Sequence, residues 1–383
     1  RMIMAGYEYV GKMPFKHVYF TGIVRDKLGR KMSKSLGNSP DPLDLIERFG
    51  ADGVRMGILL SAPAGNDILY DDSLCEQGRN FCNKIWNCFR LVKGWEVISS
   101  NSDEVAKQSQ TTSNTQAVAW FDAKLSETET EVADLFGKYR LSEALMAIYK
   151  LYTDEFSGWY LEMIKPAYQQ PIDRATYEAT LAFFDRLLKL LHPFMPFITE
   201  ELWQALTDRQ PGDSIMRESL KLKALTEDQT VVLENVETVK QVVSGVRTVR
   251  SQRNIAQKEQ LTLQVVGATL QGAYGAAAMK MANLSDISEV SEKDATASSF
   301  MVGTQEYAVP LGSLIDVEDE IAKMEAQLAH LEGFLAGVMK KLSNERFVQN
   351  APEQVVAMER KKQSDSEEKI AALKESIAAL KSK

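Results

Sequence analysis

The chain has 383 residues, more than one hydrophobic core usually organises, so two to four domains are expected. Apolar residues make up 44% and charged residues 26%, as in ordinary soluble proteins, and no apolar run approaches the roughly 20 residues of a membrane helix. The net charge of −8 excludes a uniformly basic nucleic-acid coat but permits a local basic surface.

The cysteines and the first residues indicate the compartment. Cys75, Cys82 and Cys88 form no C-x-x-C pair, so neither a zinc site nor a disulfide framework is expected. Residues 1–6 lack the apolar core of a secretory signal. Free thiols without such a signal predict a cytoplasmic protein with no bound metal.

Residues 1–70 have the pattern of a mixed α/β segment. The β-branched and aromatic run 17–21 predicts a buried strand, followed by a glycine-rich loop over 22–38. Asp41 and Pro42 then supply the N-cap and first residue of a helix.

Two further residues of this segment mark helix ends. Gly50 stands where the first helix would stop. Asp52 follows, and we expect it to cap the next helix over 54–60.

From about residue 71 to 210 the apolar spacing is that of long amphipathic helices. They are expected over 73–93, 115–136, 140–165 and 174–206, which predicts a helical bundle. The polar stretch 99–115 predicts a flexible connection, and Pro193 and Pro196 should form a kink or corner.

Residues 216–312 predict a small α/β module. A strand is expected over 261–266, with two short strands near Phe300 and Tyr307. The preceding helix has apolar positions at Val239, Val242, Val243, Val246 and Val249.

The end of the chain has heptad spacing. The seam comprises Leu314, Val317, Ile321, Met324, Leu328, Leu331, Leu335, Val338 and Leu342, and after a break it resumes at Ile370, Leu373, Ile377 and Leu380. The break over 343–352 favours an antiparallel hairpin over a dimerising coiled coil. Each helix of roughly 30 residues would be about 45 Å long.

The main chemical signal is the loop 29–38, Gly-Arg-Lys-Met-Ser-Lys-Ser-Leu-Gly-Asn. Lysines offer point charges to phosphate oxygens, hydroxyls and loop amides add donors, and glycines let the backbone rearrange. Such a loop can stabilise the charge that develops on a leaving pyrophosphate. Composition alone leaves a solvated basic turn as an equal alternative.

The order of residues 31–35 resembles the K-M-S-K-S signature of class I aminoacyl-tRNA synthetases, and residues 36–38 resemble its extension in the subgroup for branched aliphatic amino acids and methionine. The resemblance implies that the loop binds ATP, with its Mg²⁺, during adenylation of the amino acid. It makes Lys34 the principal phosphate ligand and Lys31 a supporting one. The implied ATP-binding residues are Lys31, Met32, Ser33, Lys34 and Ser35. The resemblance supports the same role for Asn38 less strongly.

The flanking sequences are similar to those of the valine-specific enzymes in this family. The similar stretches are residues 14–26, 61–68, 78–87 and 340–352. Isoleucine enzymes often end in a cysteine-rich zinc module, which is absent from this sequence. The resemblance covers essentially the whole chain and implies valine, ATP and a valine tRNA as partners.

One departure from the family pattern limits the expected activity. The H-I-G-H-type motif of the opposite active-site wall is absent, since the only histidines are His17, His192 and His330. The inserted editing domain is absent as well, although an apolar valine pocket rejects threonine by only about a hundredfold. We therefore expect a C-terminal fragment, beginning shortly before the loop, that cannot activate valine alone.

Several cations are candidates for tRNA contact. Lys84, Trp86 and Arg90 lie within two turns of one helix, where the ring could stack on an anticodon base or be buried in the core. Around the turn of the hairpin the candidates are Lys340, Lys341, Arg346, Arg360, Lys361 and Lys362. Arg247, Arg250 and Arg253 recur at helical spacing, and could follow a phosphate backbone or simply solvate their helix.

The expected fold is mainly α. It comprises the C-terminal remnant of a Rossmann-type catalytic domain (1–70), a helical anticodon-binding domain (71–215), a small α/β module (216–312) and a coiled-coil tRNA-binding arm (313–383). The expected function is part of a monomeric valine-tRNA ligase. The alternatives are a tRNA-binding module without catalysis, a synthetase for isoleucine, leucine or methionine, and a structural coiled coil.

Overall fold

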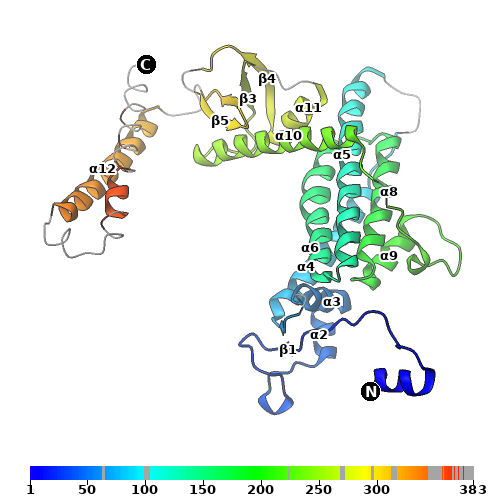
Figure 1. Ribbon diagram of the computed structural model, residues 1–383. Coiled ribbons are helices and arrows are strands. Elements are labelled where there is room, and N and C mark those ends of the chain that lie inside the picture. The colour runs from blue at the N-terminus through cyan, green and yellow to red at the C-terminus, as the bar shows by residue number, and fades with distance from the viewer. Residues whose placement is uncertain are drawn as a thin grey trace. The chain divides into compact units, whose positions relative to one another are not determined.

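The computed structural model describes residues 1–62, 65–98, 104–222, 224–267, 272–294, 297–311, 317–343, 356, 358–364, 366, 370 and 374. As expected, the described chain is mainly helical (Figure 1). It divides into two compact units, residues 1–239 with 271–281, and residues 240–270 with 282–383. None of the described helices is long and apolar enough to span a membrane.

The first unit begins with α1 (Met2–Ala5), the π-helical η1 (Gly6–Val10) and an irregular segment leading to β1 (Val24–Arg25). The strand predicted over 17–21 is wrong, and Phe20 is 81% exposed. A strand requires a backbone partner, and no described segment pairs with these residues. β1 itself pairs in parallel with β2 (Ile68–Leu69).

Local sequence signals correctly placed helix α2 (Pro42–Phe49). The Asp41 carboxylate accepts a hydrogen bond from the backbone N–H of Leu43 at 2.8 Å, and Gly50 ends the helix with φ +75°. Only a residue tolerant of left-handed backbone stops a helix there without strain.

Asp52 caps a different helix from the predicted one. Helix α3 (Ala51–Leu60) begins before Asp52, whose buried carboxylate accepts hydrogen bonds from the backbone N–H groups of Phe197 and Ile198 at 3.3 and 2.7 Å. These groups open α9 (Pro196–Leu206), where the carboxylate satisfies two backbone donors that the helix leaves unpaired, and burial raises the pKa of Asp52 despite these bonds. Asp52 thereby joins α3 to the bundle.

The predicted bundle helices are present. They are α4 (Asp72–Lys93), α5 (Glu104–Gly137), α6 (Leu141–Lys150), the π-helical η3 (Leu151–Tyr160), α7 (Leu161–Ile164), α8 (Arg174–Leu191) and α9. The corner at Pro193 and Pro196 is confirmed. The flexible connection predicted over 99–115 is wrong from Glu104 onward, because that stretch contains no glycine or proline to stop α5; residues 99–103 lie outside the described chain.

An ion pair ties α8 to α5 inside the bundle. Arg186 donates from Nε and Nη2 to the two carboxylate oxygens of Glu129 at 2.9 and 2.8 Å, and the Glu129 side chain is only 1% exposed. Arg186 also pairs with Asp122 and donates to the Ser126 hydroxyl at 2.9 Å. Two helices distant in sequence are therefore joined by a nearly fully satisfied charge cluster.

The remaining helices of this region are η4 (Ile215–Arg217), α10 (Glu227–Gln252) and α11 (Gly272–Ala282). The predicted valine face of α10 is buried. Gly245 permits close packing there, because a Cβ on it would lie 2.2 Å from the Phe300 ring.

The second unit contains a four-stranded sheet in the order β4-β3-β6-β5. Its strands are β3 (Leu261–Val266), β4 (Leu284–Val290), β5 (Ser298–Val302) and β6 (Gln305–Val309). β3 pairs in parallel with β4, whereas the β3–β6 and β5–β6 pairs are antiparallel. The three predicted strands are confirmed; β4 was not predicted, because its apolar residues Leu284, Ile287 and Val290 recur at every third position rather than at every second.

The heptad segment forms α12 (Val317–Leu342), with Val338 of the predicted seam buried. Ion pairs join Lys341 to Glu359 at 3.9 Å and Glu332 to Lys374 at 2.8 Å. The residue nearer the end of α12 pairs with the earlier of the two partners, and the residue further back pairs with the later one. This is the order of contacts between antiparallel segments. The seam positions Leu314, Leu373, Ile377 and Leu380 and most of the predicted turn lie outside the described residues.

Candidate functional site

The loop 29–38 is fixed at its base by β1 and β2. The Asp67 carboxylate accepts from the backbone N–H of Ile23 at 3.1 Å and pairs with the guanidinium of Arg25. Arg25 also forms a backbone bridge with Lys31. The strand that enters the loop is thus held both to β2 and to the loop itself.

Asp26, which was not predicted as a site residue, organises the loop from behind. Its side chain accepts from the backbone N–H groups of Leu28 and Arg30 at 3.1 and 2.8 Å, and from Arg30 Nε at 2.8 Å. Asn38 Nδ2 adds a fourth bond at 3.0 Å. The bond from Asn38, and then those from Arg30, lower the pKa of Asp26 to about 2. Arg30 therefore serves as a partner of Asp26.

The Asn38 amide bridges three points of the segment. In addition to its bond with Asp26, Nδ2 donates to the carbonyl of Lys31 at 3.3 Å, and Oδ1 accepts from the backbone N–H of Ser33 at 2.9 Å. The amide thus holds the backbone on both sides of Met32.

The serines shape the next turn. Ser33 Oγ accepts from the backbone N–H of Leu36 at 3.2 Å, capping the 3-10 helix η2 (Lys34–Leu36), and lies 2.8 Å from Ser35 Oγ. Gly37 ends the turn with φ +63°. The hydroxyls, which were expected to contact phosphate, are bonded to the loop and to each other here.

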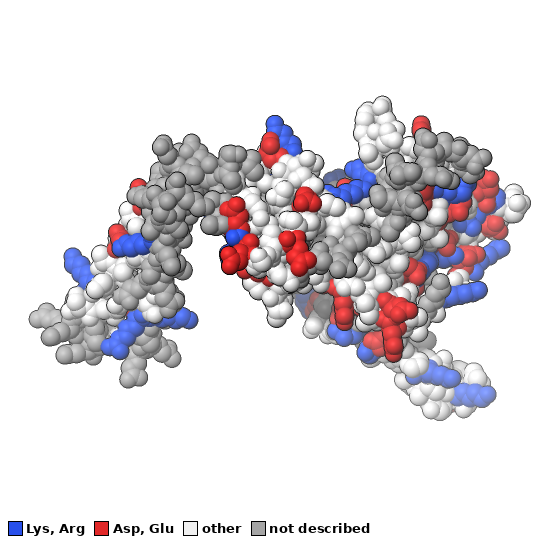
Figure 2. Space-filling model, turned by 90° about the horizontal axis from the view of Figure 1, so that it is seen from above, with Lys and Arg blue, Asp and Glu red and all other residues white. Residues whose placement is uncertain are grey.

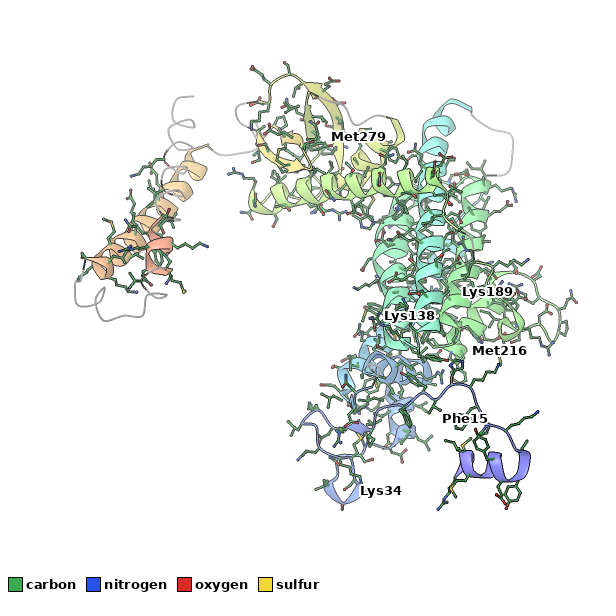
Figure 3. All side chains as sticks on the ribbon, in the orientation of Figure 1. Phe15, Lys34, Lys138, Lys189, Met216 and Met279 are labelled. Carbon is green, nitrogen blue, oxygen red and sulfur yellow. The ribbon has the colours of Figure 1, made fainter. Side chains whose placement is uncertain are left out.

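The two lysines are the available charges of the loop. Lys31 and Lys34 are exposed, and neither forms an ion pair with any residue that the structure describes. Figure 3 shows Lys34 at the end of the unit away from the bundle. The loop therefore presents two uncompensated ammonium groups, which is the arrangement that an anionic ligand requires.

An open cleft of about 510 Å³ lies beside the loop. Its lining includes Asp26, Met32 and Asn38 from the loop segment, Tyr70, which follows β2, and Asp71, which caps α4. Lys31 and Lys34 are not among its lining residues. Of the predicted ATP-binding residues 31–35 only Met32 lines this cleft, together with the weaker candidate Asn38.

The three candidates on α4 do not share one face. Trp86 is 42% exposed, so the alternative that its ring is buried in the core is wrong, and Arg90 is exposed one turn further on. Lys84 is partly buried, donates to the carbonyl of Thr153 at 3.3 Å, and lines a separate cleft of about 520 Å³. Residues two apart point to opposite sides of a helix, whereas residues four apart lie together.

The possible phosphate contact by Arg250 is wrong. Its side chain is 1% exposed and donates to the carbonyls of Ala256, Ala282 and Asn283 at 3.1, 3.1 and 3.0 Å. Helical spacing alone did not reveal that this position faces inward.

The cations on the arm fall into two sets. Lys341 and Lys362 lie 3.9 and 2.7 Å from the largely buried carboxylate of Glu359. Lys340, Arg360 and Lys361 are exposed, and Figure 2 shows Lys and Arg side chains projecting from the arm. Arg346 lies outside the described residues.

No metal-ligand cluster occurs within the described part of the chain, where no three His, Cys, Asp or Glu side chains gather to hold an ion. The three cysteines are free thiols.

Three family models match separate parts of the chain. Residues 1–71 match "tRNA synthetases class I (I, L, M and V)", residues 119–266 match "Anticodon-binding domain of tRNA ligase", and residues 316–381 match "Valyl tRNA synthetase tRNA binding arm". With the signature loop in place, the chain belongs to the class I tRNA synthetases.

Within this family the sequence is similar to valine-specific enzymes. It is 65% identical to a valine-tRNA ligase of Phocaeicola vulgatus and 64% identical to one of Bacteroides thetaiotaomicron, over 100% of this chain and 42% of each relative. The chain thus spans about two fifths of the length of these curated relatives. Among solved structures, a LeuRS of Agrobacterium radiobacter K84 in a ternary complex with tRNA and LeuAMS is 22% identical, with a TM-score of 0.40, over 61% of this chain and 26% of that one.

Proposed function

We propose that this chain supplies the ATP-contacting loop and the tRNA-binding part of a valine-tRNA ligase. In the complete reaction, ATP and valine give valyl-adenylate and pyrophosphate, and the valyl group then passes to the terminal ribose of the tRNA. The observation that carries this proposal is a signature loop with two exposed, uncompensated lysines, in a chain 65% identical to valine-tRNA ligases.

Lys34 and Lys31 are the proposed contacts for the phosphates of Mg²⁺-ATP. Neither ammonium group is ion-paired with a described residue, so no such pair has to break before phosphate binds. The negative charge that develops on the leaving pyrophosphate then strengthens the attraction. Met32, Ser33 and Ser35 are proposed to contact ATP when the loop closes on it, although the hydroxyls are bonded within the loop here.

The chain is proposed to comprise four domains. They are the remnant of the catalytic domain (1–70), the anticodon-binding bundle (71–215), the α/β module (216–312) and the hairpin arm (313–383). On α4, the exposed Trp86 stacks on an anticodon base while Arg90 meets the adjacent phosphate. Lys84 borders its own cleft and contacts a different nucleotide. The working protein is proposed to be a cytoplasmic monomer.

The function is tested with a chimera in which this chain replaces the matching 42% of the Phocaeicola vulgatus ligase. The chimera should exchange pyrophosphate in the presence of valine and form valyl-tRNA, whereas the 383-residue chain alone should do neither. A folded chimera that binds valine tRNA but gives no valine-dependent exchange would favour a tRNA-binding module without catalysis.

On the arm, neighbouring lysines should differ in their effect on tRNA binding. Lys361→Ala removes an exposed cation and should weaken binding of valine tRNA, with a loss of about one unit in the slope of log K against log salt. Lys362→Ala is the matched control, because its charge is already neutralised by Glu359 at 2.7 Å. Filter binding across a range of KCl concentrations measures both slopes. An equal slope change in the two variants would contradict the assignment.

A further inference from the structure

Resting on the proposed function, we propose that Asn38 and Asp26 are positioning residues for adenylation: their hydrogen-bonded pair, here termed the latch, sets the loop conformation that presents Lys31 and Lys34 to ATP. Neither residue needs to touch the nucleotide. Each acts through the backbone that carries the lysines.

The geometry requires an amide at position 38. The Asn38 side chain donates to a carboxylate oxygen and a carbonyl while accepting from a backbone N–H, at 3.0, 3.3 and 2.9 Å respectively. A carboxylate of the same size could accept from Ser33 but could not donate to Asp26 or to Lys31. It would also place two carboxylates at hydrogen-bond distance, where they repel.

The carboxylate of Asp26 is the fixed end of the latch. It is 8% exposed and accepts four hydrogen bonds, all from residues 28–38. Two of these bonds come from Arg30, one of them from its guanidinium, so Asp26 also neutralises the cation that precedes the two free lysines. The positive charge of the loop is thereby confined to Lys31 and Lys34.

Two glycines bound the latched segment. Gly29 and Gly37 have φ of +76° and +63°, a conformation that other residues rarely adopt. The side chain of Asn38, which follows Gly37, holds the backbone between these glycines on both sides of Met32. Loss of the latch should therefore free residues 31–36 while leaving β1 and α2 in place.

The experiment uses the chimera with three variants: Asn38→Asp, Asp26→Asn and the double exchange. Asn38→Asp should lower kcat/KM for ATP in pyrophosphate exchange by about 10- to 100-fold. The variant loses a hydrogen bond to a charged group, and the two lysines lose the orientation that the loop gives them. The KM for tRNA should not change. The double exchange restores a donor opposite an acceptor between positions 26 and 38, but not the bonds to Arg30 Nε and the Lys31 carbonyl, so it should recover part of the loss seen in the worse single variant.

The 383-residue chain provides a readout that does not depend on catalysis. Asn38→Ala should speed hydrogen exchange at the Ser33 amide by about tenfold or more, since that amide loses its acceptor, while exchange within α8 stays unchanged. Asp26 should also titrate closer to its ordinary pKa in this variant, because Asn38 provides the bond that lowers it most.

Normal ATP kinetics in Asn38→Asp, or no recovery in the double exchange, would overturn the latch. So would unchanged exchange at Ser33 in Asn38→Ala. If the unmodified chimera itself lacks valine-dependent exchange, the proposed function fails, and this outcome is distinct from an active chimera that is insensitive to changes at Asn38.

Discussion

Replacement of Lys34 by alanine in the chimera should slow valine-dependent pyrophosphate exchange by about 100- to 1,000-fold, the usual cost of losing one preorganised stabilising group. The lysine is exposed and forms no ion pair with the described residues, so its charge is available to the ligand. Its main effect should fall on kcat, because negative charge grows on the leaving pyrophosphate in the transition state.

Lys12→Ala is the matched control for this prediction. Lys12 is another exposed cation of the first 70 residues, but it lies outside the signature and the latch and is not among the residues that line the cleft. Its removal should change the exchange rate by less than about threefold, consistent with the small effect of a distant surface charge. Binding of valine tRNA should be the same in both variants. Exchange at the normal rate in Lys34→Ala would show that the loop does not stabilise pyrophosphate.

Features set by neighbouring residues could be predicted from the sequence. The cap at Asp41, the stop at Gly50 and the corner at Pro193 each depend on the conformational limits of one or two residues. The helix α12 follows likewise from a continuous apolar period. These elements occur in the structure where the local pattern placed them.

Features set by distant partners could not be predicted. The run 17–21 has strand composition but no described strand beside it, and Asp52 caps a helix that begins 144 residues later, at Pro196. Arg250 sits at the same helical spacing as its neighbouring arginines, yet carbonyls from two other segments surround it. Periodicity identifies the side of a helix but not what will pack against that side.

The candidate site shows the same division. Lys31 and Lys34 were found because the signature is a contiguous string of residues. Asp26 escaped notice because it lies 12 residues from Asn38, and its importance is visible only when four donors converge on one carboxylate. Trp86 and Lys84 were grouped by proximity in sequence, whereas the buried face of α4 separates them.

Arg186→Met should destabilise the first unit by about 3–5 kcal/mol, the cost of leaving a buried charge without its partner. The Glu129 side chain is 1% exposed and would lose both of its guanidinium bonds. All five tryptophans lie between residues 86 and 203, so urea unfolding followed by tryptophan fluorescence reports on this unit specifically. Arg140→Met, which breaks an exposed pair with Glu143, should cost less than about 1 kcal/mol.

The double variant Arg186→Met with Glu129→Leu separates two explanations of this loss. If the cost arises from an orphaned carboxylate, removing that carboxylate should recover most of the stability, because a buried ion pair is often no better than well-packed apolar side chains. If the double variant is as unstable as the single one, the guanidinium stabilises the bundle mainly through Asp122 and Ser126.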